Sequence, residues 1–100
     1  LSINPKCAEA AYNQANVNQS QGDWLRGQGK DPSGAYARAI AAYENALLIN
    51  PRYAEAANNQ ALVYQSQGDW LRGQGKDPSE AYARALAGCE KALSINARYG

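Results

Sequence analysis

Residues 19–33 read QSQGDWLRGQGKDPS, and the same fifteen residues return unchanged at 65–79. The similarity extends outward on both sides, because residues 1–46 align with 47–92 without a gap and 35 of the 46 aligned positions are identical. Self-similarity at a fixed period indicates a repeat architecture in which each unit is one supersecondary element. A third copy starts with LSIN at 93–96 and then stops. We therefore interpret the chain as a section of a longer array, or as a sequence designed to resemble one.

Each unit divides into two helical segments. The first starts at Pro5 and Pro51, because a proline at the first helical position lacks only an N–H that would be unpaired there. The second starts after Asp31 and Asp77, whose carboxylates are placed to cap it, and Glu80 completes an arrangement like a capping box. Apolar residues of the second segment recur at i, i+3, i+4 and i+7, which predicts one buried face. This face comprises Tyr36, Ala39, Ile40, Tyr43, Ala46 and Leu47 in the first copy, and Tyr82, Ala85, Leu86, Cys89, Ala92 and Leu93 in the second.

The segment between the two helices, residues 22–31 and again 68–77, allows two interpretations. Gly22 is placed to end the first helix. Alternatively the helix continues through Trp24 and Leu25 and ends near Gly27 or Gly29. We favour the longer helix, because Trp24 and Leu25 would then pack on Tyr36, but the sequence leaves both alternatives open.

These patterns predict two repeats with the following boundaries. The first occupies 5–50, with helices at about 5–27 and 32–49, and the second occupies 51–96, with helices at about 51–73 and 78–95. Residues 1–4 are interpreted as the tail of a preceding repeat and 97–100 as a terminal stub.

The unit resembles the tetratricopeptide repeat over nearly its whole length. Residues 8–24 are similar to helix A of that family and its following turn, residues 37–47 to helix B, and Ile49-Asn50-Pro51 to the motif that ends a repeat. The unit is about 12 residues longer than the usual 34, and Ala11 and Ala57 replace the early tryptophan of helix A. The resemblance implies an all-α, right-handed solenoid of antiparallel helical hairpins.

The resemblance also implies a function, since helix A of such arrays lines a concave groove that binds an extended peptide or a helix. Asn13 and Asn59 match positions where some members carry asparagines that hydrogen-bond the ligand backbone, and an amide suits this task because it both donates and accepts. The other groove candidates are Tyr12, Asn58, Asn16, Gln19 and Gln65, with Glu9 and Glu55 at the rim. We expect a protein or peptide partner, neutral or mildly basic, and a scaffold rather than an enzyme.

The two copies differ where the ends of an array should differ. Asn16 and Asn18 stand where the second copy has Leu62 and Tyr64, which we interpret as a polar N-terminal cap or, alternatively, as part of a wide polar groove. The C-terminal end shows less capping, because Gly88 and Cys89 replace Ala42 and Tyr43. Uncapped apolar ends favour end-to-end stacking into oligomers or filaments, which is the alternative function.

Several other function classes find no support in the composition. The chain has no histidine and its charged residues repeat with the unit, so neither a catalytic site nor a metal site is expected, and no cofactor. Arg26, Lys30 and Trp24 form a small basic and aromatic group, but Asp23 and Asp31 cancel its charge. With a net charge of +1 and no long apolar run, no nucleic acid or membrane partner is expected. Two cysteines far apart in sequence favour reduced thiols and a cytoplasmic location.

Overall fold

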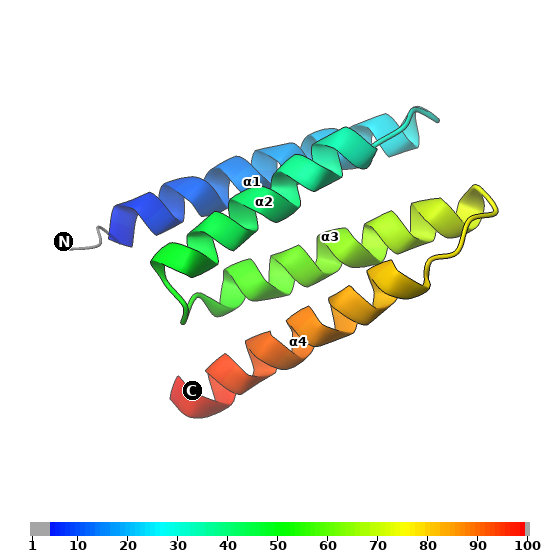
Figure 1. Ribbon diagram of the computed structural model, residues 1–100. Helices are drawn as coiled ribbons and strands as arrows, with labels where there is room; N and C mark the ends of the chain where they lie inside the picture. Colours follow the sequence, from blue (N-terminus) through cyan, green and yellow to red (C-terminus); the bar gives the residue numbers. More distant parts are fainter. Residues whose placement is uncertain (1–4, 100) are drawn as a thin grey trace.

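The computed structural model describes residues 5–99, which form four helices arranged as two antiparallel hairpins (Figure 1). The helices are α1 (Pro5–Gly27), α2 (Ser33–Ile49), α3 (Ala54–Gly73) and α4 (Ser79–Tyr99). Helix α1 pairs with α2, α3 pairs with α4, and α3 also packs on α2 to join the hairpins. The predicted all-α fold of antiparallel helical hairpins is confirmed, while the right-handed solenoid stays a prediction. The predicted tail at 1–4 and the last residue of the predicted stub lie outside the described residues.

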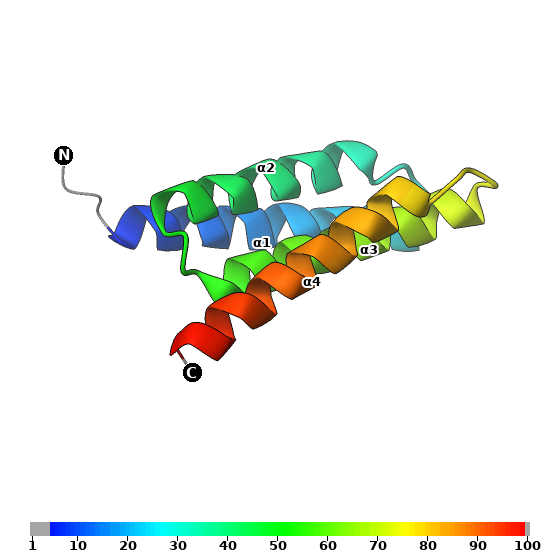
Figure 2. The same cartoon turned by 60° about the horizontal axis from the view of Figure 1, so that its bottom comes forward.

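The two hairpin loops have the same structure and lie at the same end of the molecule (Figures 1 and 2). Gly29 and Gly75 have φ values of +74° and +75°, a region that favours glycine. After each of them the backbone N–H of Lys30 or Lys76 donates to the carbonyl of Leu25 or Leu71 at 2.9 Å. This is a Schellman arrangement, which satisfies the last carbonyls of the helix. Helix α1 therefore ends at Gly27, the longer of the two alternatives.

Gly22 lies inside helix α1 and serves close packing rather than helix termination. A Cβ atom at this position would lie 2.5 Å from two ring carbons of Tyr36, and one at Gly68 would lie 2.6 Å from the ring of Tyr82. Glycine thus lets each aromatic ring of the second helix rest directly on the backbone of the first. Trp24 was expected to pack on Tyr36, but its side chain is 59% exposed.

The starts of the helices follow the capping prediction in part. The Oδ1 atoms of Asp31 and Asp77 accept the backbone N–H of Ser33 and Ser79 at 2.9 Å, which fixes the first turns of α2 and α4. Glu80 does not fulfil the predicted capping-box role: its carboxylate pairs with Arg84 at 2.7 Å, because the i, i+4 spacing places both side chains on one exposed face.

Helix α3 begins three residues later than predicted. The side chain of Asn50 accepts the N–H of Arg52 at 3.1 Å, and its carbonyl accepts the N–H of Tyr53 at 3.1 Å. These bonds hold residues 50–53 in a turn, so the helix starts at Ala54 rather than at Pro51. The turn gives the chain room to reverse between the hairpins.

The core lies where α2 packs between α1 and α3. The predicted apolar face of α2 is buried there: Tyr36, Ala39, Tyr43, Ala46 and Leu47 are all buried, and Ile40 is partly buried. Helix α3 contributes Ala56, Ala57 and Val63, none of which has exposed surface. Small residues on α3 against aromatic residues on α2 allow the two hairpins to approach closely.

The corresponding face of α4 is largely uncovered. Ala85 and Ala92 are buried, but Leu86 is 66% exposed, Leu93 is 68% exposed and Cys89 is exposed as well. The prediction that Cys89 is a core residue is therefore wrong. The physical reason is the number of neighbours: within residues 5–99, α2 packs on both α1 and α3, whereas α4 packs on α3 alone.

Candidate protein-binding surfaces

A polar network joins α1, α2 and α3 and contains four of the nine predicted groove residues. The hydroxyl of Tyr43 donates toward the side-chain oxygens of Asn16 and Gln19, the latter at 2.7 Å. The Nδ2 group of Asn59 donates to the hydroxyl of Tyr12 at 2.9 Å and to Oδ1 of Asn16 at 3.3 Å. The network thus links both hairpins through side chains of the first helix of each.

Tyrosine rings pack together at this network, and one of them, Tyr53, makes none of its hydrogen bonds. The ring of Tyr12 lies against Tyr53, with centroids 4.9 Å apart, and against Tyr43, with centroids 5.9 Å apart. Burial raises the pKa of Tyr43 to about 12, because the ionised phenolate would lose its hydration there. Tyr53, the last residue of the turn at 50–53, was not among the predicted groove residues.

The remaining predicted groove residues are not part of the network. Their side chains are exposed on α1 and α3; they are Glu9, Asn13, Glu55, Asn58 and Gln65. A hollow of about 490 Å³ also lies between these two helices, lined by Asp23, Arg26 and Gly27 of α1 and by Ser66 of α3. The exposed surface of α1 and α3 therefore carries amides and carboxylates, and a shallow depression lies farther along the same two helices, toward their loop end.

The expectation that Asn16 belongs to a polar cap facing solvent is wrong. Asn16 is half-buried and points toward α2 and α3, where it accepts hydrogen bonds from Tyr43 and Asn59. The aligned residue Leu62 lies on the corresponding side of α3, where no further helix of the described chain covers it, and it is 43% exposed. The polar residue Asn16 is thus covered by neighbouring helices, whereas the apolar residue Leu62 is open to solvent. A polar cap that faces solvent would require the opposite arrangement.

An apolar groove of about 420 Å³ lies along the open side of the second hairpin. Its lining comes from α3 and α4: Gln65, Asp69, Arg72, Tyr82, Ala85, Leu86 and Cys89. Each lining residue has an aligned residue 46 positions earlier in the chain. These aligned residues lie on the side of α1 and α2 that faces α3. The groove is therefore the uncovered equivalent of the contact that holds the two hairpins together.

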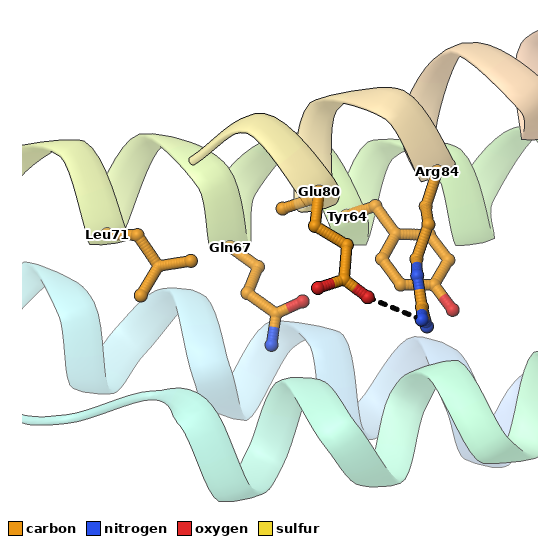
Figure 3. A pocket seen from close by; sticks show the side chains of 6 residues that line it. Tyr64, Gln67, Leu71, Glu80 and Arg84 are labelled. Carbon is orange, nitrogen blue, oxygen red and sulfur yellow. Dashed lines mark hydrogen bonds and ion pairs between the residues drawn. The ribbon is translucent and has the colours of Figure 1, made fainter. Parts of the chain in front are cut away.

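A smaller pocket of about 230 Å³ lies on the opposite side of the same hairpin (Figure 3). The guanidinium of Arg84 stands 5.9 Å from the ring centroid of Tyr64 and pairs with Glu80 at 2.7 Å. Because Tyr64 and Glu80 both favour its charged form, the pKa of Arg84 is raised. The Arg84 charge is already compensated, so this pocket offers little attraction to an anionic ligand.

One aromatic–cation pair lies beside each hairpin loop, between a tryptophan of the first helix and a lysine of the loop. The ammonium of Lys30 lies 5.7 Å from the ring centroid of Trp24, and that of Lys76 lies 6.0 Å from Trp70. Such pairs are worth about 0.5–1 kcal/mol at exposed sites.

Neither a metal centre nor a disulfide occurs among the side chains that the structure describes. Cys7 and Cys89 are both free and exposed. None of the helices within residues 5–99 combines the length and the apolar character that crossing a lipid bilayer demands.

Comparisons with protein-family models, with characterised proteins and with solved structures find no match to this chain. The two helical hairpins and their shared internal contacts are thus established by the structure, and no family is identified.

Proposed function

We propose that this chain is a protein-binding scaffold that holds an extended peptide segment along the exposed surface of α1 and α3. The observation that carries the proposal is the fixed orientation of Asn59. Its Nδ2 group is held by Tyr12 and Asn16, so its side-chain oxygen is oriented in advance to accept the N–H of a bound peptide. The resemblance to tetratricopeptide arrays supports the same surface.

The surrounding side chains suit a neutral or mildly basic segment. Asn13 and Asn58 are exposed near this surface and can pair with peptide groups without selecting a side chain. Glu9 and Glu55 are also exposed and provide negative charge for a lysine or arginine of the partner. The hollow between α1 and α3 gives room for one side chain of the ligand.

The test is selection of peptides from a random library displayed on phage, followed by binding measurements on the selected peptides. We expect the double variant Asn13→Ala, Asn59→Ala to weaken binding at least about tenfold, since each lost hydrogen bond is worth about 1 kcal/mol. Asn45→Ala, the same change at an exposed position of α2, is the matched control and should bind as the parent chain does. Failure to enrich any peptide, or equal binding by all variants, would contradict the proposal.

A second candidate function is end-to-end self-assembly. It is favoured by the exposed leucines of α4, Leu86 and Leu93, beside an apolar groove. Exposed apolar surface of this kind is typical of a contact with another protein surface.

A further inference from the structure

The two hairpins are joined through one face of α3, which we call the α3 face and which consists of Ala56, Asn59, Gln60 and Val63. Ala56 and Val63 have no exposed surface. Gln60 is 8% exposed, and its Nε2 group donates to the carbonyl of Ile40 at 3.2 Å and to Glu44 at 3.1 Å. The α3 face thus combines the apolar contacts of Ala56 and Val63 with hydrogen bonds from the Gln60 amide to α2.

Helix α1 carries the same four residue types at the same spacing. Within the described chain, these residues of α1 are not covered by another helix. The α1 face consists of Ala10, Asn13, Gln14 and Val17, all of which are exposed. Val17 is 68% exposed, whereas its counterpart Val63 has no exposed surface. Within the described chain, one end of the molecule therefore presents an unused copy of the surface that forms the internal junction.

The other end presents the receptor for that surface. Leu86 and Glu90 of α4 are aligned with Ile40 and Glu44, the two residues that receive Gln60, and both are exposed. Beside them lies the apolar groove of about 420 Å³ described above, whose lining is aligned with the surface that α3 covers in the first hairpin.

We infer that a second copy of this chain docks its α1 face into the groove on α3 and α4, as α3 docks on the first hairpin. In this contact Gln14 of one copy donates to the carbonyl of Leu86 and to Glu90 of the next, and Val17 covers the groove. The inference specifies the second candidate function, self-assembly, and does not require peptide binding; because Asn13 belongs to both surfaces, a peptide bound there would compete with the second copy. Since the two mating faces differ, the contact is heterologous and repeats into linear oligomers instead of closing as a two-fold dimer.

The contact between copies is expected to be weaker than the internal one. Three tyrosines pack together at the internal junction, Tyr12, Tyr43 and Tyr53. The aligned residues at the contact between copies are Asn58, Cys89 and Cys7, which fill less space. Less buried aromatic area means a lower affinity, so association should depend on concentration.

The test is sedimentation equilibrium of the purified chain over a range of concentrations up to roughly 1 mM, the scale of a weak specific contact. We expect the average mass to rise above 10.7 kDa and to pass beyond that of a dimer. Val17→Glu on the α1 face and Leu86→Glu on α4 should each reduce association at least about tenfold, because either change buries an unpaired charge in the contact. Leu48→Glu, at a leucine of α2 that is 69% exposed and outside both faces, should associate like the parent.

Mixing the variants distinguishes this arrangement from any other. Val17→Glu keeps an intact groove and Leu86→Glu keeps an intact α1 face, so the two together should form a dimer and no larger species. Circular dichroism of each variant alone verifies that it is folded. A parent chain that stays monomeric, a single variant that still associates fully, or a mixture that stays monomeric would overturn the inference. Each of these results leaves the peptide-selection experiment unaffected.

Discussion

Replacing Gly22 by alanine tests whether the approach of α1 and α2 depends on a missing side chain. The added Cβ would lie 2.5 Å from two ring carbons of Tyr36. That ring has no exposed surface, and its hydroxyl donates to Asp23 at 2.6 Å, so it cannot move aside without breaking a hydrogen bond. Overpacking costs about 1–3 kcal/mol, and the better helix propensity of alanine offsets about 1 kcal/mol. We expect a net loss of up to about 2 kcal/mol in the free energy of unfolding, which is the difference between these two contributions.

The assay is urea unfolding followed by circular dichroism at low protein concentration, where association is negligible. Gly27→Ala is the matched control, because it lies in the same helix with no atom within 4 Å of the added Cβ, and its stability should be unchanged or slightly higher. Gly68→Ala should cost less than Gly22→Ala, since the ring of Tyr82 is only partly buried and can yield. If Gly22→Ala proved as stable as Gly27→Ala, the packing argument would be refuted.

Three further predictions concern the junction, the buried tyrosine and a helix cap. Gln60→Ala removes two hydrogen bonds to α2 and should lower the free energy of unfolding by about 1–3 kcal/mol. Gln14→Ala, at the exposed counterpart on α1, should change it by less than about 0.5 kcal/mol. Equal effects of the two variants in denaturant titrations would contradict the junction described above. The pKa of Tyr43 is raised from 10.0 to about 12, so the folded state retains this proton more tightly, and stability present below pH 10 should decline as the pH rises toward 12. Tyr43→Phe should flatten this decline in stability, as measured by unfolding curves recorded between these two pH values. If the stability of the variant fell with pH as steeply as that of the parent, the raised pKa of Tyr43 would not be its cause. Hydrogen bonds from Ser79 lower the pKa of Asp77 below 3.8, so its contribution is present above that pH and lost as the pH falls. Asp77→Asn keeps a cap but does not titrate, so its difference in Tm from the parent should vary between about pH 5 and pH 2; a constant difference would speak against the cap.

The helices and their pairing could be predicted from the sequence because their signals are local. Asp31 and Asp77 mark the starts of the second helices, and the spacing of Tyr36, Tyr43 and Leu47 predicts the buried face of α2. The position of Ala54 could not be predicted in the same way. Asn50 can either cap a helix that starts at Pro51 or hold a turn, and the packing of the second hairpin on the first decides between them.

Burial was harder to predict, because identical local sequences have different neighbours. Val17 and Val63 occupy the same position of the repeat, yet one is exposed and the other is fully buried. Cys89 lies in the same helical pattern as Tyr43, but within the described chain α4 packs on α3 alone, so no second helix covers Cys89. Among the candidate groove residues, the sequence indicated amides on α1 and α3, but it could not show that Asn16, Gln19 and Asn59 bond to tyrosines of the fold itself.

Within residues 5–99, α4 packs on one neighbouring helix only, which has a consequence for the order in which the helices open. In a stack of repeats, local free energy comes from each unit and from its adjoining contacts, and a terminal helix with one contact can detach while the rest stays folded. Backbone amides of α4 should therefore exchange with solvent deuterium sooner than those of α2, which α1 and α3 hold from two sides. Any molecule that occupies the groove beside Leu86 would slow this exchange, so the exchange rate of α4 reports directly on whether that groove is occupied.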